Sequence, residues 1–284
     1  AAPLTVFVPP FFVKDRLNCE TARWGGSNFF TGAPRTKIPL VVDVFIVASE
    51  MDLMESRMYE LSESVDYVVV GISPKNHRGD PQPNWFAHAR DEQHRFTPTM
   101  LSKILLVDVG LCDAHKAAQN DVKATHNNHG SEWEHQLTQR DCLWKHGMNM
   151  LRERLQKDLR LKDIEDDTVF LFTDVDEIPE RQLVYHVKHC ELRPKALPAH
   201  LRMRVNGHNF RVPCTNGKTS FTGASEISEW KTIKEDDGVI YRFRAPPHLK
   251  KRQKNAIHDA GVHLTWYGSM AFVDYKGFTH AEGG

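Results

Sequence analysis

No apolar stretch of this sequence is long enough to cross a membrane. The longest runs, such as residues 38–48, fall well short of the roughly 20 residues that a spanning helix needs. The first ten residues also lack the basic segment and the apolar core of a secretory signal peptide. These absences predict a soluble, cytoplasmic protein without a membrane span in this chain. The alternative that the sequence leaves open is a Golgi-type anchor that has been removed.

The sequence has no excess of charge of either sign, because Lys and Arg together number 37 and Asp and Glu together also number 37. A balanced chain has no long-range field that would attract nucleic acid or an anionic membrane. We therefore expect no nucleic-acid partner, and any recognition of phosphate has to be local.

Cysteine is scarce and follows no recognisable framework. The five cysteines are odd in number and never spaced as C-x-x-C: Cys19, Cys112, Cys142, Cys190 and Cys214. This usage favours a reducing compartment with buried thiols over disulfides, and it gives no zinc-site spacing. The histidines of residues 126–129, with His135 beyond them, lack cysteine or glutamate at zinc-site spacing, so we interpret this segment as a loop.

From residue 39 onward the sequence alternates between apolar strands and helices. Strands are expected at 40–47, 65–70, 103–109 and 168–173, in 199–212, and near 239–244 and 262–267. Helices are expected at 50–62, 131–159 and 180–189, with a long loop over 73–100. This alternation predicts an α/β fold with a mostly parallel sheet and helices on both faces. Residues 1–37 are expected to form an irregular N-terminal segment before a single domain over 38–284.

The most informative motif is Asp174-Val-Asp176, which directly follows the apolar run 168–173 and precedes Glu177 and Pro179. Residues two apart on an extended chain point the same way, so both carboxylates are expected to converge beyond the strand. Adjacent carboxylates repel unless a cation or a proton lies between them, and Mg²⁺ or Mn²⁺ suits an all-oxygen pair. Ligands of open α/β sheets bind at the carboxyl ends of strands. The motif therefore predicts a metal that bridges a nucleotide diphosphate.

Other sites also use such an acidic pair. An EF-hand is excluded, because the sixth position of its loop needs Gly and is Pro179 here. A phosphohydrolase with Asp174 as nucleophile and Asp176 as acid and base is an alternative, although its motif is expected on the first strand rather than mid-chain. A solvated turn or a helix N-cap is the purely structural alternative.

Several blocks of the sequence, in constant order, resemble glycosyltransferase family 17, which includes the bisecting N-acetylglucosaminyltransferase of N-glycans. These blocks are residues 42–61, 65–70 and 79–83, Trp133 with Arg140, and residues 173–179, 261–266 and 278–282. The resemblance covers roughly residues 40–282. The family also has soluble members, such as those of large algal viruses, which this chain resembles. The resemblance implies a GT-A fold: a Rossmann-like sheet, a UDP-sugar donor, and a D-x-D motif that holds metal against the diphosphate.

The resemblance also implies roles for single residues. Metal ligands for Mn²⁺ or Mg²⁺ are expected among Asp174, Asp176, His263 and His280. Donor contacts are expected from Glu50, Arg57, Arg140, Asp174, Asp176, Arg202 and Arg204. The arginines are of interest because departing UDP carries growing negative charge. Inverting transfer, which gives a β-linkage, needs a carboxylate to take the acceptor proton, and the candidates are Asp259, Glu226 and Glu229.

The sequence leaves the donor sugar and the acceptor open. Where the family usually has Glu followed by Ser or Ala, this chain has Gly71 and Ile72, so UDP-xylose and UDP-GlcNAc both stay candidate donors. The expected partners are this donor and a glycan or glycoprotein acceptor. The contrasting hypothesis is a non-catalytic glycan-binding module on a transferase fold. Loss of either motif aspartate would favour that module, and both are present.

Overall fold

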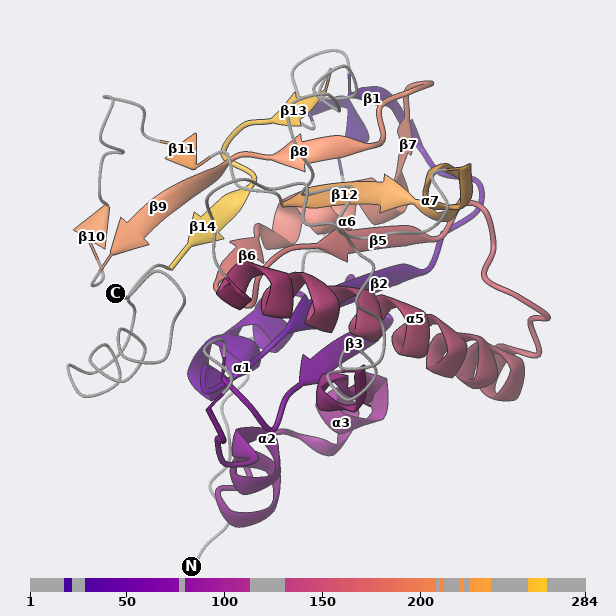
Figure 1. The fold of residues 1–284 in the computed structure, drawn as a ribbon. Helices are drawn as coiled ribbons and strands as arrows, with labels where there is room; N and C mark the ends of the chain where they lie inside the picture. The colour runs from indigo at the N-terminus through magenta and orange to yellow at the C-terminus, as the bar shows by residue number, and fades with distance from the viewer. Residues whose placement is uncertain are drawn as a thin grey trace, which may run out of the picture.

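The structure is a computed structural model that describes residues 18–21, 29–76, 80–112, 131–207, 210–211, 220–221, 225–235 and 255–264 (Figure 1). Within these ranges, none of the helices combines the length and the apolar character that a membrane span requires.

A seven-stranded sheet lies at the centre of the described fold, in the order β13-β8-β12-β5-β2-β3-β4. Its strands are β2 (Val41–Ile46), β3 (Tyr67–Ile72), β4 (Ile104–Asp108), β5 (Val169–Phe172), β8 (Ala199–Leu201), β12 (Glu226–Glu229) and β13 (Ala256–Ile257). Strands β4, β3, β2 and β5 run parallel to one another, whereas β12 is antiparallel to both β5 and β8. The predicted mostly parallel sheet is therefore present, with an antiparallel strand beside β5.

The helices of the fold are α1 (Met51–Glu60), α2 (Trp85–Ala87), α3 (Pro98–Lys103), α5 (Ser131–Leu159), α6 (Arg181–His189) and α7 (Trp230–Glu235). Single helical turns add η2 (Cys19–Thr21), η4 (His88–Glu92) and η5 (Val109–Cys112). The expectation of a long loop over 73–100 was thus wrong in part, because α2, η4 and the start of α3 lie within it.

Alternate residues of the parallel strands face opposite sides of the sheet, and helices cover both sides. On one side Val42 and Phe170 pack in a cluster with Leu151 of α5, and Figure 1 shows α5 crossing in front of the sheet. On the other side Val41 and Leu171 pack in a cluster that includes residues of α1 and α6. Two apolar faces explain why these strands read as continuous hydrophobic runs in the sequence. The prediction of helices on both faces is confirmed.

A smaller sheet extends the fold beyond β5, in the order β10-β9-β14-β6, with β11 paired to β9. Its strands are β6 (Glu177–Pro179), β9 (Met203–Gly207), β10 (Phe210–Arg211), β11 (Ser220–Phe221) and β14 (Gly261–His263). Strand β6 starts directly after the Asp174-Val-Asp176 motif, and β14 carries His263. The strand expected near 239–244 lies outside the described residues.

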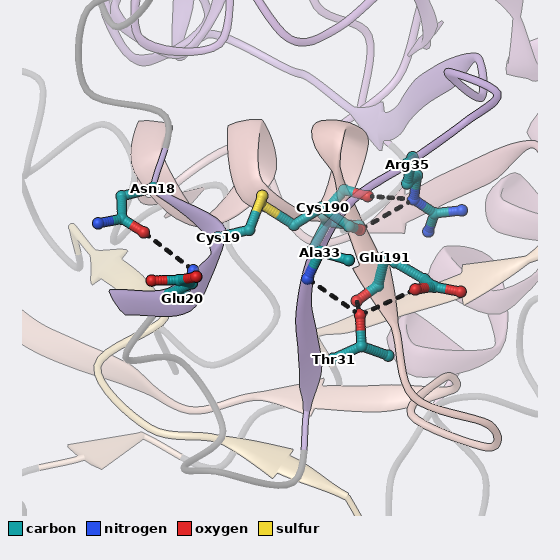
Figure 2. The surroundings of a disulfide bond; sticks show 9 residues. Asn18, Cys19, Glu20, Thr31, Ala33, Arg35, Cys190 and Glu191 are labelled. Atoms are coloured by element: carbon teal, nitrogen blue, oxygen red, sulfur yellow. Dashed lines mark hydrogen bonds between the residues drawn. A yellow bond between two sulfur atoms is a disulfide. The ribbon is translucent and has the colours of Figure 1, made fainter.

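The N-terminal part is tied to the end of α6. Strand β1 (Phe30–Pro34) pairs antiparallel with β7 (Cys190–Leu192), and a disulfide joins Cys19 of η2 to Cys190 (Figure 2). Nearby, the Thr31 hydroxyl donates to a carboxylate oxygen of Glu191 at 3.0 Å. Arg35 Nε donates to the carbonyl of Cys190 at 3.1 Å. The prediction of an irregular N-terminal segment was therefore wrong for residues 30–34.

A second disulfide joins Cys112 at the end of η5 to Cys142 of α5. The prediction of buried thiols was wrong for the four cysteines in these two bonds, and Cys214 lies outside the described residues. The partners are 171 and 30 residues apart, and no spacing pattern predicts pairings of that kind. Only the fold brings them within bonding distance.

The two disulfides predict a specific thiol count. Under denaturing conditions without reductant, alkylation should modify no more than one of the five cysteines, and after reduction it should modify all five, as read from the intact mass. Replacing Cys19 and Cys190 by Ser should lower the free energy of unfolding by about 2–4 kcal/mol, because a long loop is no longer closed in the unfolded chain. Labelling of several thiols without reductant would contradict this pairing.

Candidate functional site

The two aspartates lie in a tight turn at the carboxyl end of β5. The N–H of Glu177 donates to the carbonyl of Asp174 at 3.0 Å, which closes a four-residue turn. Val175 in the middle is buried, while 39% of the Asp174 side chain and only 13% of the Asp176 side chain is exposed. The expectation that an extended chain aims both carboxylates the same way was wrong, because the strand ends at Phe172 and the chain turns.

Arg57 of α1 holds this turn from below the surface. Its guanidinium is fully buried and donates to both carboxylate oxygens of Asp43 on β2, at 2.7 and 2.6 Å. It also donates to the carbonyls of Asp174 and Glu177, at 3.0 and 2.7 Å, and to the Thr173 hydroxyl. All five N–H groups of the side chain are thus used within the protein. Arg57, expected to contact the donor, has a supporting position instead.

Glu177 braces the turn from the opposite side. Its buried carboxylate accepts the N–H of Asp174 at 2.9 Å and the hydroxyl of Ser225, which directly precedes β12. A buried carboxylate needs such donors to offset its lost hydration. The third acid of the motif therefore fixes the turn to the neighbouring strand.

Asp176 faces His263 across the smaller sheet. Because β14 pairs antiparallel with β6, His263 lies opposite Glu177, and its Nε2 is 3.6 Å from Asp176 Oδ2. Burial by itself lowers the pKa of His263, but the adjacent carboxylate of Asp176, with added contributions from the charges of Glu177 and Asp174, outweighs it. The pKa of His263 therefore lies above its ordinary value, which reflects the negative charge gathered at this point.

Asp174 faces α5 instead. Arg140 of α5 is buried, and its Nη2 donates to Asp174 Oδ1 at 3.1 Å. One residue earlier, the amide of Gln139 donates to the Ser73 hydroxyl at 3.0 Å, at the carboxyl end of β3. The first half of α5 thus reaches the ends of two parallel strands, and the predicted contact of Arg140 with a donor phosphate stays a prediction.

Some, but not all, of the candidate metal ligands at the turn lie close enough together to bind one divalent cation. Carboxylate oxygen and imidazole nitrogen are both ligands that Mn²⁺ accepts, and the structure brings Asp176 and His263 together. Asp174 does not join them in one tight group. Among the described residues, only Cys112, Cys142 and His146 place three candidate ligand atoms within 4.8 Å of one another, and both sulfurs there form a disulfide. His280 lies outside the described residues.

The three candidate bases fall at very different places. Glu226 lies opposite Phe172, at the carboxyl end of β5, and is buried. Glu229 lies opposite Val169, at the other end of β5, and pairs with Lys231 at 2.7 Å. Asp259 lies in an exposed turn at φ 52°, beyond the end of β6 that is farther from Asp176. The structure brings Glu226 to the turn and does not bring Glu229 or Asp259.

The other residues predicted to contact the donor are Glu50, Arg202 and Arg204, and they lie outside the aspartate turn. Glu50 lies at the end of β2, where its carboxylate accepts the N–H of Ala48 at 3.1 Å. The backbone of Arg202 bonds to Ile257 and Ala260 beside the Asp259 turn. Arg204 lies opposite Val262, so its side chain leaves the sheet on the face opposite His263. Neither arginine is brought to the aspartate turn.

A cleft that the sequence did not indicate lies at the carboxyl ends of β2, β3 and β4. Its volume is about 100 Å³, and its lining includes Ala48, Ser73, Asn84, Trp85 and Asp108. A larger cleft of about 410 Å³ shares Asn84 and Trp85 with it but is lined by no residue of β5 or the turn. The available signal was a polar residue just after β3, Ser73, and one at the end of β4, Asp108, at the edge where a parallel sheet binds ligands.

Comparison with known proteins places the turn inside a recognised family. The sequence model of glycosyltransferase family 17 matches residues 111–267, more than half of the chain. The match includes α5, the aspartate turn, strands β6 and β14 of the smaller sheet, and His263. Neither the comparison with curated proteins nor that with solved structures gave a match.

Gly261 allows β14 to approach β6. A Cβ at this position would lie 2.1 Å from the carbonyl oxygen of Ile178, and backbone of that kind cannot move aside cheaply. Gly261→Ala should therefore destabilise the protein by about 1–3 kcal/mol and move His263 away from Asp176. Chemical denaturation measures the first effect, with Val262→Ala on the same strand as control. If both variants lost the same small amount of unfolding free energy, the close approach of β14 to β6 would not require glycine at position 261.

Proposed function

This chain belongs to glycosyltransferase family 17, and from that premise we propose that it is a metal-dependent, inverting transferase. It moves a sugar, xylose or N-acetylglucosamine, from a UDP-sugar to a hydroxyl of a glycan acceptor and forms a β-linkage. The observation that carries the proposal is the aspartate turn at the carboxyl end of β5, inside the stretch that matches the family. The GT-A arrangement belongs to the same proposal.

Asp176 and His263 are the residues that would hold the cation, since their side chains already face each other at 3.6 Å. A divalent cation bound there would neutralise the charge that grows on the donor diphosphate as its bond to the sugar breaks. Asp174 would contribute from the other side of the turn, where Arg140 fixes its carboxylate. These separate roles agree with the structure, in which Asp174 faces Arg140 and Asp176 faces His263.

The nucleoside of the donor would extend from the larger cleft, which shares Asn84 and Trp85, into the cleft at the ends of β2, β3 and β4. That cleft lies on the ligand-binding edge of the sheet and offers an indole at Trp85 with polar groups at Ser73, Asn84 and Asp108. Arg140 lies between this edge and the turn, because its helix touches both Ser73 and Asp174. A guanidinium in that position suits a diphosphate.

Glu226 is the proposed general base. The acceptor oxygen attacks the anomeric carbon while the bond from that carbon to the UDP oxygen breaks, and the hydroxyl proton passes to the Glu226 carboxylate. Of the three candidates, only Glu226 lies beside the carboxyl end of β5, and its burial keeps water from competing for the proton.

The phosphohydrolase alternative would use Asp174 as a nucleophile. The ion pair between Asp174 and Arg140, and the position of the turn on the fourth parallel strand of the chain, both favour a binding role. A non-catalytic module would bind a glycan without turning over a nucleotide sugar. Release of phosphate from simple esters would support the first alternative, and binding without turnover the second.

The donor can be identified by thermal shift. A ligand that binds the native state alone raises the melting temperature according to its concentration and affinity. One UDP-sugar should raise the melting temperature with Mn²⁺ present and should lose most of this effect with EDTA. Asp176→Asn should abolish the metal-dependent part, with Asp163→Asn, an exposed carboxylate paired with Arg152, as the matched control. The absence of any shift across the panel would contradict the proposal.

The base can be tested separately from binding. Glu226→Gln should lower the turnover number for sugar transfer by about 10²–10⁴-fold, because proton removal is lost, while the thermal shift by the donor is retained. Glu229→Gln, on the same strand but at the far end of β5, serves as the matched control. Equal transfer rates for the Glu226 variant and the wild type would remove Glu226 from this role.

A further inference from the structure

We propose that Arg57, oriented by Asp43, is a positioning residue that sets the geometry of the metal-binding turn. This inference rests on the proposed function in so far as the turn binds a metal. None of the hydrogen bonds of Arg57 goes to the side chain of a proposed metal ligand. It acts through the backbone of Asp174 and Glu177 and through the Thr173 hydroxyl.

The burial of this pair is the first argument. Both side chains are almost fully excluded from solvent, although an apolar pair of similar volume would often be as stable in a core. Stability of the core is therefore no explanation for this particular pair, and its geometry has to be considered. The rigid guanidinium offers directed N–H groups, since its five donors lie in one plane.

The direction of those donors is the second argument. The two bonds to Asp43 fix the plane of the guanidinium relative to β2. The three remaining bonds reach the residue before the turn and both ends of the turn, at Thr173, Asp174 and Glu177. One planar group therefore fixes the distance between the two ends of the turn. The positions of the Asp174 and Asp176 side chains depend on the backbone that is held in this way. The ring of Phe45, 4.7 Å from the guanidinium carbon, covers its face.

Thr173 provides the cleanest test, because its hydroxyl can be removed without a change in shape. Thr173→Val removes one acceptor of Arg57, whereas Thr173→Ser keeps it. Arg57→Lys keeps the charge beside Asp43 but cannot supply the planar set of donors. Arg181→Gln is the structural control, since it removes an ion pair with Glu60 on the same helix and leaves the turn untouched. All are made in the full chain.

Two quantities are measured in each variant: the dissociation constant for Mn²⁺ and the hydrogen exchange rate of the Asp174 amide. Supporting partners of metal ligands typically change metal affinity by about 10–100-fold when they are removed. Thr173→Val and Arg57→Lys should weaken Mn²⁺ binding within this range and speed exchange of the amide. Thr173→Ser should restore both, and Arg181→Gln should lower the melting temperature without moving either.

The proposal is overturned if Thr173→Val and Thr173→Ser behave alike, or if Mn²⁺ affinity follows the melting temperature through all variants including Arg181→Gln. Failure of the proposed function gives a different result, because the wild type itself then binds no Mn²⁺. In that case the exchange of the Asp174 amide still decides whether Arg57 holds the turn. Equal exchange in the Val and Ser variants would show that it does not.

Discussion

The buried ion pair between Arg57 and Asp43 is the interaction on which the candidate site depends. It joins the first helix, the first strand of the parallel sheet and the aspartate turn through one planar group. A charge pair without solvent needs every donor and acceptor satisfied, or its burial costs several kcal/mol. That requirement makes the turn part of the core rather than a free loop. The carboxylates at its surface are therefore carried on a fixed backbone.

Two sheets contribute residues to the site: the parallel strands contribute polar residues at a cleft, and the smaller sheet contributes a histidine. The parallel strands bring polar residues to one edge, where a cleft opens beside Ser73 and Asp108. The smaller sheet brings His263 opposite Glu177 through the pairing of β14 with β6, which places its Nε2 3.6 Å from Asp176. Long helix α5 joins the two, since Arg140 reaches the turn and a disulfide at Cys142 fastens the helix to η5. The composition predicted buried thiols, whereas Cys19, Cys112, Cys142 and Cys190 form disulfides.

The sequence alone determined the four parallel strands, helices α1, α5 and α6, the two-faced sheet and the motif at the end of β5. These features are local: apolar runs buried on both faces, a helical period over 131–159, and acids directly after a strand. The family resemblance was also carried by short blocks, and the match over 111–267 bears it out. Such patterns can be recognised from the sequence because they depend only on residues that lie close together along the chain.

Only the tertiary structure decided which residues meet. It paired four of the cysteines, placed Glu226 rather than Glu229 beside the carboxyl end of β5 through strand register, and turned Arg57 into the core. It also showed that a turn, not an extended strand, carries Asp174 and Asp176, so that one faces Arg140 and the other His263. Each of these outcomes depends on contacts between distant segments. Spacing along a chain cannot fix such contacts, because the same spacing is compatible with many registers and turns.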